Sequence, residues 1–183
     1  MSDVEYIKSF LTIYQDFPKK GVAFCDIFPL FRNPLAFEAL VTHFVHHLVS
    51  DVIPNSPDKK IDVIVALDSR GFLLGPVIAL RLGAAFVPVR KRGKLPGECE
   101  RAAFEKEYGT DEFEMQAGAI VPGQTVVIVD DIIATGGSAA AASDLVTKQG
   151  GKLLKNIFIA EVTSLKGKDK LNTPTYSIVQ VDG

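Results

Sequence analysis

The chain has 183 residues, of which 47% are hydrophobic and 23% charged, and its formal net charge is −2. This length suits one domain with a substantial core, and the composition excludes a wholly disordered chain. The lack of a basic surplus argues against a general nucleic-acid binder, and the sequence has no apolar run of the roughly 18 residues that a membrane span needs. Cys25 and Cys99 are too few for a disulfide framework, so we expect free thiols in a cytoplasmic protein.

The first 50 residues predict a helical extension of the domain. Apolar residues spaced three and four apart between positions 4 and 14 share one face of a helix. Residues 16–21 contain a proline and a glycine, which end that helix. Asn33 can cap a second helix, Pro34 suits its first position, and apolar residues follow at helical spacing.

From residue 61 onward, short β-branched runs alternate with helical stretches. Continuous apolar runs indicate strands buried on both faces, and their alternation with helices indicates right-handed β–α–β units. We therefore predict an α/β fold with a mainly parallel sheet flanked by helices, which forms a single domain over residues 1–183 together with the extension. Strands are expected at residues 61–67, 84–89, 125–129, 153–162 and 176–181, and helices at 72–82 and about 139–149.

Residues 91–111 do not fit a compact connection. Ten of these 21 residues are charged, and Gly93, Pro96 and Gly97 interrupt the segment. Loops longer than about 12–15 residues are uncommon unless they are lids, binding loops or disordered. Because lysines and arginines crowd its first positions, we predict a mobile lid over an anionic ligand. A solvated excursion without function is the alternative.

The chemistry is concentrated after the strand expected at 125–129. Asp130 and Asp131 follow this strand, and a small, glycine-containing turn at 134–138 then opens a helix. Ligands of parallel α/β sheets bind outside the carboxyl ends of the strands. The backbone N–H groups of the turn and the helix N-terminus are suited to a phosphate.

The two acids repel phosphate, so they fit sugar hydroxyls, a divalent cation or both. The motif therefore indicates a ligand that carries a sugar between phosphates. It is neither a Walker sequence, since no lysine follows the glycines, nor the dinucleotide fingerprint. The alternative is that Asp130 and Asp131 only cap and pair locally.

Residues 127–138 closely resemble the signature of the type I phosphoribosyltransferases, which bind 5-phosphoribosyl-1-pyrophosphate. The likeness covers nearly the whole chain and sharpens to the members of that family that use adenine. It implies the family's fold, with an N-terminal hood at about residues 1–50 and a long mobile catalytic loop at about 91–111. The further matching stretches are residues 16–18, 21–24, 66–72, 89–98, 107–109 and 163–167.

The resemblance also implies roles for individual residues. The turn would hold the 5-phosphate, and the acids would hold the ribose hydroxyls and, through water, a Mg²⁺ ion that the substrate mainly carries. A second turn, after the strand expected at 61–67, would contact the pyrophosphate, with further cations against its charge. The implied substrate-binding residues are Ala134, Thr135, Gly136, Gly137 and Ser138 for the phosphate, Asp130 and Asp131 for the ribose, and Asp68, Ser69, Arg70, Arg90, Lys91 and Lys94 for the pyrophosphate.

The base would lie under the hood. The resemblance places backbone groups near Ala23 and Cys25 against it, Phe24 and Ile132 beside it, and Tyr108 in the lid over the site. Many relatives have a longer polar residue in place of Cys25, which makes backbone recognition the expected contribution of that position. Core packing is the alternative for Phe24 and Ile132, because most apolar residues are simply buried.

The implied reaction is the displacement of pyrophosphate from C1 of the ribose by adenine, which gives AMP and serves purine salvage. Arg70 would stabilise the departing charge and Glu107 would handle the proton of the purine, unless Glu107 is only a solvated lid charge. The resemblance also implies a homodimer. Two alternatives stay open, namely transfer to hypoxanthine, guanine or xanthine, and a non-catalytic regulator that senses the phosphoribosyl ligand.

Overall fold

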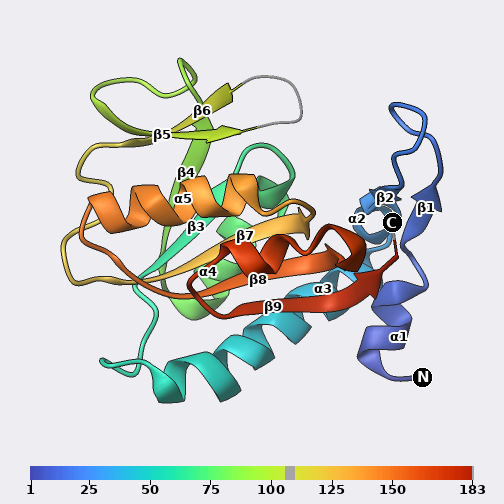
Figure 1. The fold of residues 1–183 in the computed structure, drawn as a ribbon. Coiled ribbons are helices and arrows are strands. Elements are labelled where there is room, and N and C mark those ends of the chain that lie inside the picture. Colours follow the sequence, from blue (N-terminus) through green and yellow to red (C-terminus); the bar gives the residue numbers. More distant parts are fainter. Residues whose placement is uncertain (106–109, 183) are drawn as a thin grey trace.

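The computed structural model describes residues 1–105 and 110–182, and within them one large twisted sheet lies between helices (Figure 1). Its strand order is β5-β6-β4-β3-β7-β8-β9. The strands β3, β4, β7, β8 and β9 pair in parallel, whereas β5 and β6 form an antiparallel hairpin on β4. The bounds are β3 (Val63–Leu67), β4 (Ala85–Lys91), β5 (Cys99–Glu105), β6 (Thr110–Gln116), β7 (Thr125–Ile133), β8 (Lys152–Val162) and β9 (Thr175–Val181).

The helices cover both faces of the sheet. On one face, Ile64 and Ala66 of β3 join a core with α3 and α4, and on the other, Val65 joins a core with α5. Both faces of β3 are thus buried, which explains its uninterrupted apolar sequence. The helices are α1 (Asp3–Lys8), α2 (Phe28–Arg32), α3 (Pro34–His47), α4 (Gly75–Leu82) and α5 (Gly137–Lys148), with short turns η1 (Leu48–Val52), η2 (Ile53–Asn55), η3 (Arg70–Leu73), η4 (Thr163–Leu165) and η5 (Gly167–Lys170).

The predicted α/β class and mainly parallel sheet are confirmed. All five expected strands are present, and α3, α4 and α5 occupy the expected helical stretches. Asn33 caps α3 as predicted, because its Oδ1 accepts hydrogen bonds from the backbone N–H groups of Leu35 at 3.0 Å and Ala36 at 3.1 Å.

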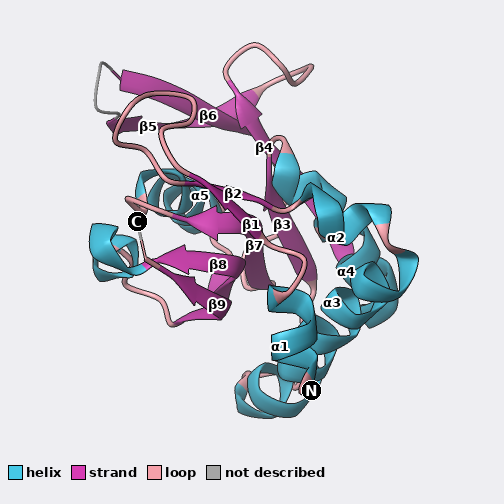
Figure 2. Ribbon diagram, turned by 90° about the vertical axis from the view of Figure 1, so that its right-hand side faces the viewer, coloured by secondary structure: helices cyan, strands magenta, loops and turns pink. Residues whose placement is uncertain are grey.

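The prediction of one helix from residue 4 to residue 14 is wrong. The helix α1 ends at Lys8, and β1 (Thr12–Tyr14) pairs antiparallel with β2 (Phe24–Asp26). Threonine, isoleucine and tyrosine favour strands, and pairing with β2 overrides the helical spacing. The N-terminal extension therefore carries a two-stranded ribbon, which lies at the carboxyl-end edge of the main sheet (Figure 2).

The charged segment also differs from its prediction as one long loop. Its described part forms β5 and the start of β6, which pair from Cys99 with Gln116 to Glu105 with Thr110. Ala102, Phe113 and Met115 are buried against α5. Charged residues alternate with these apolar ones, which is the two-residue period of a strand. The high proportion of charged residues led instead to the prediction of a loop.

A set of contacting polar side chains connects α1 to the rest of the domain. His43 of α3 contacts Asp3 through Nδ1 at 2.5 Å and the Tyr176 hydroxyl of β9 through Nε2 at 2.5 Å. The ring of His47 stacks on Tyr176 with 3.7 Å between the ring centroids. These contacts hold the start of the N-terminal extension against the last strand. None of the helices in the described parts of the chain is long and apolar enough to cross a membrane.

The cap of α3 gives a first prediction. Asn33→Ala leaves two N–H groups of the first turn without their acceptor and should lower the free energy of unfolding by about 1 kcal/mol. Urea titration followed by circular dichroism measures this change. Asn33→Asp keeps a side-chain acceptor at the same place and is the matched control. Equal losses in both variants would show that the cap does not stabilise the helix.

Candidate functional site

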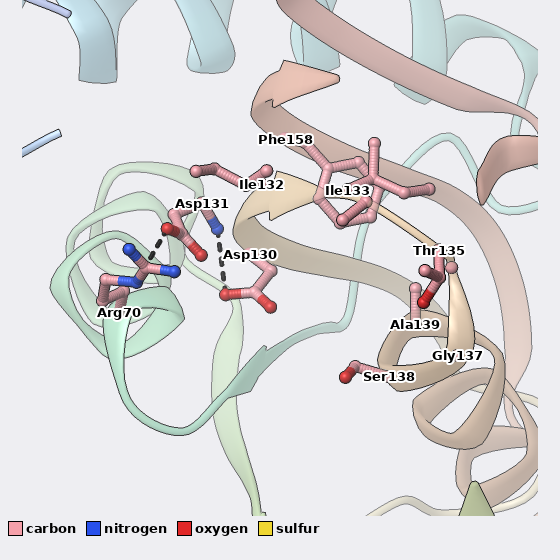
Figure 3. A pocket seen from close by; sticks show the side chains of 12 residues that line it. Arg70, Asp130, Asp131, Ile132, Ile133, Thr135, Gly137, Ser138, Ala139 and Phe158 are labelled. Atoms are coloured by element: carbon pink, nitrogen blue, oxygen red, sulfur yellow. Dashed lines mark hydrogen bonds and ion pairs between the residues drawn. The ribbon is translucent and has the colours of Figure 1, made fainter. Parts of the chain in front are cut away.

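The carboxyl ends of β3 and β7 bring together two loops that lie 60 positions apart in the sequence. Ala66 of β3 is in register with Val129 of β7, so the residues that follow each strand become neighbours. A Cβ on Gly71 would lie 2.9 Å from the Val129 carbonyl oxygen, and glycine thus permits the close approach. As a result, Arg70 Nε lies 2.9 Å from Asp131 Oδ2 (Figure 3).

The turn after β3 has an unusual backbone. The peptide bond between Asp68 and Ser69 is cis. Asp68 Oδ2 accepts a hydrogen bond of 2.8 Å from Nε of Arg90, which comes from the end of β4. Arg90 also donates to the Lys94 carbonyl oxygen at 3.1 Å. The turn thus joins the end of β4 to the edge where Asp131 lies.

Asp130 and Asp131 lie side by side near the end of β7, where Asp131 is buried and Asp130 is partly buried. The backbone N–H of Asp131 donates to Asp130 Oδ1 at 2.9 Å. Burial raises the pKa of Asp130 well above its ordinary value, and the neighbouring Asp131 charge raises it further. Burial also raises the pKa of Asp131, although the Arg70 guanidinium opposes that shift. Burial has removed water from the two carboxyls, and the hydroxyl groups of a ligand or a cation can take the place of that water.

The turn from Ala134 to Ser138 leads into α5 beside these acids. Gly136 has a φ of +79° and stands at the N-cap of α5, where no side chain of the described residues caps the helix. The first N–H groups of α5 are therefore free for an anion. The predicted turn residues Ala134, Thr135, Gly136, Gly137 and Ser138 line one cavity of about 190 Å³ together with Arg70, Asp130, Asp131, Ile132, Ile133, Ala139 and Phe158.

A second cavity of about 180 Å³ adjoins the first and is almost entirely apolar. Ile132 and Ala134 line both cavities. These two residues therefore form a shared wall that borders both the polar cavity and the apolar one. The lining residues of the second cavity are Ile13, Val22, Ala23, Phe24, Cys25, Ile132, Ala134, Val162, Val181 and Asp182.

The hood contributes a neutral surface to this second cavity. Burial, and to a lesser extent the nearby Asp131, raise the pKa of the Cys25 thiol to about 11, so the thiol stays protonated at neutral pH. The Arg70 guanidinium carbon lies 5.3 Å from the centre of the Phe24 ring. Arg70 therefore stands between the acid of one cavity and the aromatic ring of the other.

Other predicted residues lie farther from the two cavities. Arg90, Lys91 and Lys94 line neither, and Lys91 Nζ lies 3.4 Å from Asp111 Oδ2. Glu107 and Tyr108 lie outside the described residues.

Several lining residues were not predicted from the sequence. Val162 and Val181 end β8 and β9, so the rule that ligands bind at the carboxyl ends of strands would have found them. Ile13 was missed because its segment was taken for a helix, and Phe158 gave no signal because it resembles any buried strand residue.

Comparison with known proteins agrees with this geometry. The model of the phosphoribosyl transferase domain matches residues 33–181. The chain is 58% identical to the adenine phosphoribosyltransferase of Yarrowia lipolytica over 94% of this chain and 93% of that protein. It is 52% identical to adenine phosphoribosyltransferase 1 of Saccharomyces cerevisiae over 97% of this chain and 93% of that protein.

Solved structures show the same similarity. The Saccharomyces cerevisiae adenine phosphoribosyltransferase in complex with an imino-altritol bisphosphate and adenine superposes with a TM-score of 0.92 at 52% identity, covering 96% of this chain and 98% of that one. The Trypanosoma brucei enzyme in complex with AMP, pyrophosphate and ribose-5-phosphate gives a TM-score of 0.86 at 28% identity, covering 98% of this chain and 80% of that one. On the match of the domain model and of relatives over nearly its whole length, the chain belongs to the phosphoribosyltransferase family and, within it, to the adenine phosphoribosyltransferases.

Proposed function

We propose that this chain transfers the 5-phosphoribosyl group of 5-phosphoribosyl-1-pyrophosphate to adenine, giving AMP and pyrophosphate in purine salvage. The observation that carries the proposal is the pair of cavities that share Ile132 and Ala134. One cavity combines free amides with two adjacent acids, of which Asp131 is buried, and the other is apolar. A sugar phosphate and a purine on either side of this wall would meet at C1 of the ribose.

The first cavity has the donors and acceptors that a ribose phosphate needs. In our proposal, the N–H groups of residues 134–138 and the N-terminus of α5 bind the 5-phosphate. Asp130 and Asp131 accept hydrogen bonds from the ribose hydroxyls, which replaces the water that burial removed. Because both carboxyls bind as acceptors, the ligand favours their ionised forms and binding lowers their pKa values.

Arg70 is our candidate for stabilising the pyrophosphate as it leaves. Its guanidinium lines the first cavity and lies 2.9 Å from Asp131, so it adjoins the place where C1 would lie. Negative charge moves onto the pyrophosphate when the bond to C1 breaks, and a preorganised cation stabilises that charge. Asp68, Ser69, Arg90, Lys91 and Lys94 are proposed to bind the pyrophosphate from the neighbouring strand ends.

A Mg²⁺ ion fits the chemistry of this edge. Asp130 and Asp131 offer carboxylate oxygens, the ligands that Mg²⁺ prefers. No group of three or more potential ligand side chains gathers in the part of the chain that the structure describes. We therefore propose that the substrate phosphates and water hold the ion, with the two acids acting through water. Bound Mg²⁺ would neutralise charge on the pyrophosphate.

The second cavity favours adenine over 6-oxopurines. Adenine carries an amino group that needs an acceptor, whereas a 6-oxo group needs a donor. No lysine or arginine is among the described residues that line this cavity, and the charged side chain there is the carboxylate of Asp182. The backbone groups of Ala23 and Cys25 are proposed to recognise the base, with Phe24 and Ile132 beside its ring. This lining counts against hypoxanthine, guanine and xanthine.

The same features separate an enzyme from a non-catalytic sensor of the ligand. A sensor has no need of a cation placed at the leaving group, and a DNA-binding regulator would carry a basic surface. Arg70 lines the cavity, and the chain carries a net charge of −2.

We further propose a cytoplasmic homodimer. The two free cysteines suit a reducing compartment. Leu35 of α3 is 74% exposed and Leu80 of α4 is 82% exposed. These two helices contact each other, and large exposed apolar side chains on neighbouring elements are typical of an interface.

Product analysis tests the reaction directly. Purified protein mixed with adenine, 5-phosphoribosyl-1-pyrophosphate and Mg²⁺ should form AMP, detected by chromatography. Hypoxanthine, guanine and xanthine should neither give a nucleotide nor compete with adenine at equal concentration. A nucleotide formed faster from a 6-oxopurine would refute adenine as the substrate, and the absence of any nucleotide would favour the sensor.

Asp130→Asn should increase the stability of the free protein while it lowers activity. Because burial raises the pKa of Asp130 in the fold, the folded state at pH 7 must either keep a poorly solvated charge or take up a proton, and the amide avoids both costs. Each kcal/mol gained should raise the midpoint of thermal unfolding by about 2–4 °C. The gain should shrink as the pH falls below the raised pKa and vanish near the ordinary value of 3.8, where Asp130 is protonated in the unfolded chain as well.

Calorimetry at pH 7 and at pH 4, together with the AMP assay, checks this prediction. Asp144→Asn is the control, because Asp144 is an exposed acid on α5 and should show no such pH-dependent gain. If the midpoint of thermal unfolding of Asp130→Asn at pH 7 is unchanged or lower, the burial of Asp130 does not cost folding free energy.

Glu107 is proposed to handle the proton of the purine, on the basis of the family resemblance. Glu107→Leu should lower kcat by a factor of roughly 100 or more while KM for both substrates stays similar, because proton transfer acts in the transition state. Steady-state kinetics separates the two constants. Glu100→Gln changes an exposed acid of the same charged segment and should leave kcat unchanged. Wild-type turnover in Glu107→Leu would remove Glu107 from the mechanism.

A further inference from the structure

The connection between β8 and β9 packs unusually closely against the turn at 134–138. A Cβ on Gly167 would lie 2.2 Å from the Ala134 carbonyl oxygen and 2.7 Å from the Gly136 nitrogen. In the other direction, a Cβ on Gly136 would lie 2.1 Å from the Gly167 carbonyl oxygen. These distances leave room for glycine alone on both sides, so the two backbones are in direct contact.

The connection is itself held in place at several points. It forms two consecutive turns, η4 and η5, and Gly167, the first residue of η5, is buried. Lys168 Nζ lies 3.2 Å from Glu161 Oε1, whose side chain is buried at the end of β8. Thr163 Oγ1 lies 3.2 Å from Asp182 Oδ1, just after β9. The segment is therefore attached to both strands that it joins.

A small apolar cluster completes the contact. Ile133, Ala139 and Phe158 form a core separate from the two that flank the sheet, and Leu171 from the end of the connection packs against it. Ile133 and Ala139 stand on either side of the turn at 134–138. The turn thus rests on its own small core, and the β8–β9 connection supplies one wall of that core.

We propose that the β8–β9 connection, through Gly167 and Leu171, positions the backbone amides that bind the 5-phosphate. This inference rests on the proposed function of residues 134–138. Gly167 is a positioning residue, since it lines neither cavity and acts through Gly136. An anion site made of backbone N–H groups depends on their direction, and a side chain at position 167 would push against the Gly136 nitrogen itself.

Comparing AMP with adenosine isolates the contribution of the phosphate, because the two ligands differ only in that group. Isothermal calorimetry should show that wild-type protein binds AMP much more tightly than adenosine. In Gly167→Ala this ratio of affinities should fall by roughly 10-fold to 100-fold, the value of one or two charge-assisted hydrogen bonds, while adenosine binds as before. In the same variant, KM for 5-phosphoribosyl-1-pyrophosphate should rise, whereas KM for adenine should stay unchanged.

Two further variants keep the test decisive. Leu171→Ala removes a wall of the small core without any clash and should lower the same ratio by a smaller factor, which serves if Gly167→Ala does not fold. Gly151→Ala is the matched control. Its Cβ would lie 2.8 Å from Val146 Cγ1 near the C-terminal end of α5, so it disturbs the packing of that helix away from the turn and should leave the ratio unchanged.

The outcomes distinguish the positioning role of the β8–β9 connection from the phosphate site itself. An unchanged ratio in both Gly167→Ala and Leu171→Ala would overturn the positioning role while the phosphate site stands. Equal losses for AMP and adenosine, or the same loss in Gly151→Ala, would show a general packing defect and also overturn it. Equal affinities of the wild-type protein for AMP and adenosine would overturn the phosphate site itself.

Discussion

Asp130 and Asp131 follow each other at the end of β7, and burial raises the pKa of both carboxyls. Two adjacent charges removed from water need a cation and hydrogen-bond donors. Arg70, 2.9 Å from Asp131, and the backbone N–H of Asp131, which donates to Asp130, meet part of that need. The two carboxyls still lack hydrogen-bond donors and positive charge. Ribose hydroxyls together with a bound Mg²⁺ ion would supply both. The fold therefore holds at this edge a polar cluster whose need for charge and hydrogen-bond donors is met only in part by the neighbouring residues described above.

The parallel sheet is what makes this edge possible. Because β3 and β7 run in the same direction and in register, the turns that follow them meet on one side, and Gly71 lets them approach within contact distance. The same geometry sets the free N–H groups of α5 beside the acids. Helices on both faces exclude water from the strands, so the polar groups stand at the boundary between a dry core and the ligand cavity.

The second cavity is assembled from distant parts of the chain. The β1–β2 ribbon supplies Ile13 and Phe24, β7 supplies Ile132, and the ends of β8 and β9 supply Val162 and Val181. Its apolar character follows from this origin, because strand ends and the hood present mainly aliphatic and aromatic side chains. A neutral Cys25 thiol keeps charge out of that part of the hood. A flat, largely apolar base and a charged sugar phosphate can thus be held by separate surfaces that meet at Ile132 and Ala134.

The sequence by itself determined the α/β class, the five parallel strands, the capped helix α3 and the acid-glycine turn, since each rests on local periodicity or on adjacent residues. Through strand ends and the family resemblance, it also identified many of the residues that line the two cavities, among them Arg70, the two acids, the turn at 134–138 and residues 23–25. Only the tertiary structure decided the β1–β2 ribbon, the β5–β6 hairpin and the contact of Gly136 with Gly167. In these cases the stabilising partner lies far along the chain, so neither propensity nor spacing within a short window contains the pairing that determines the conformation.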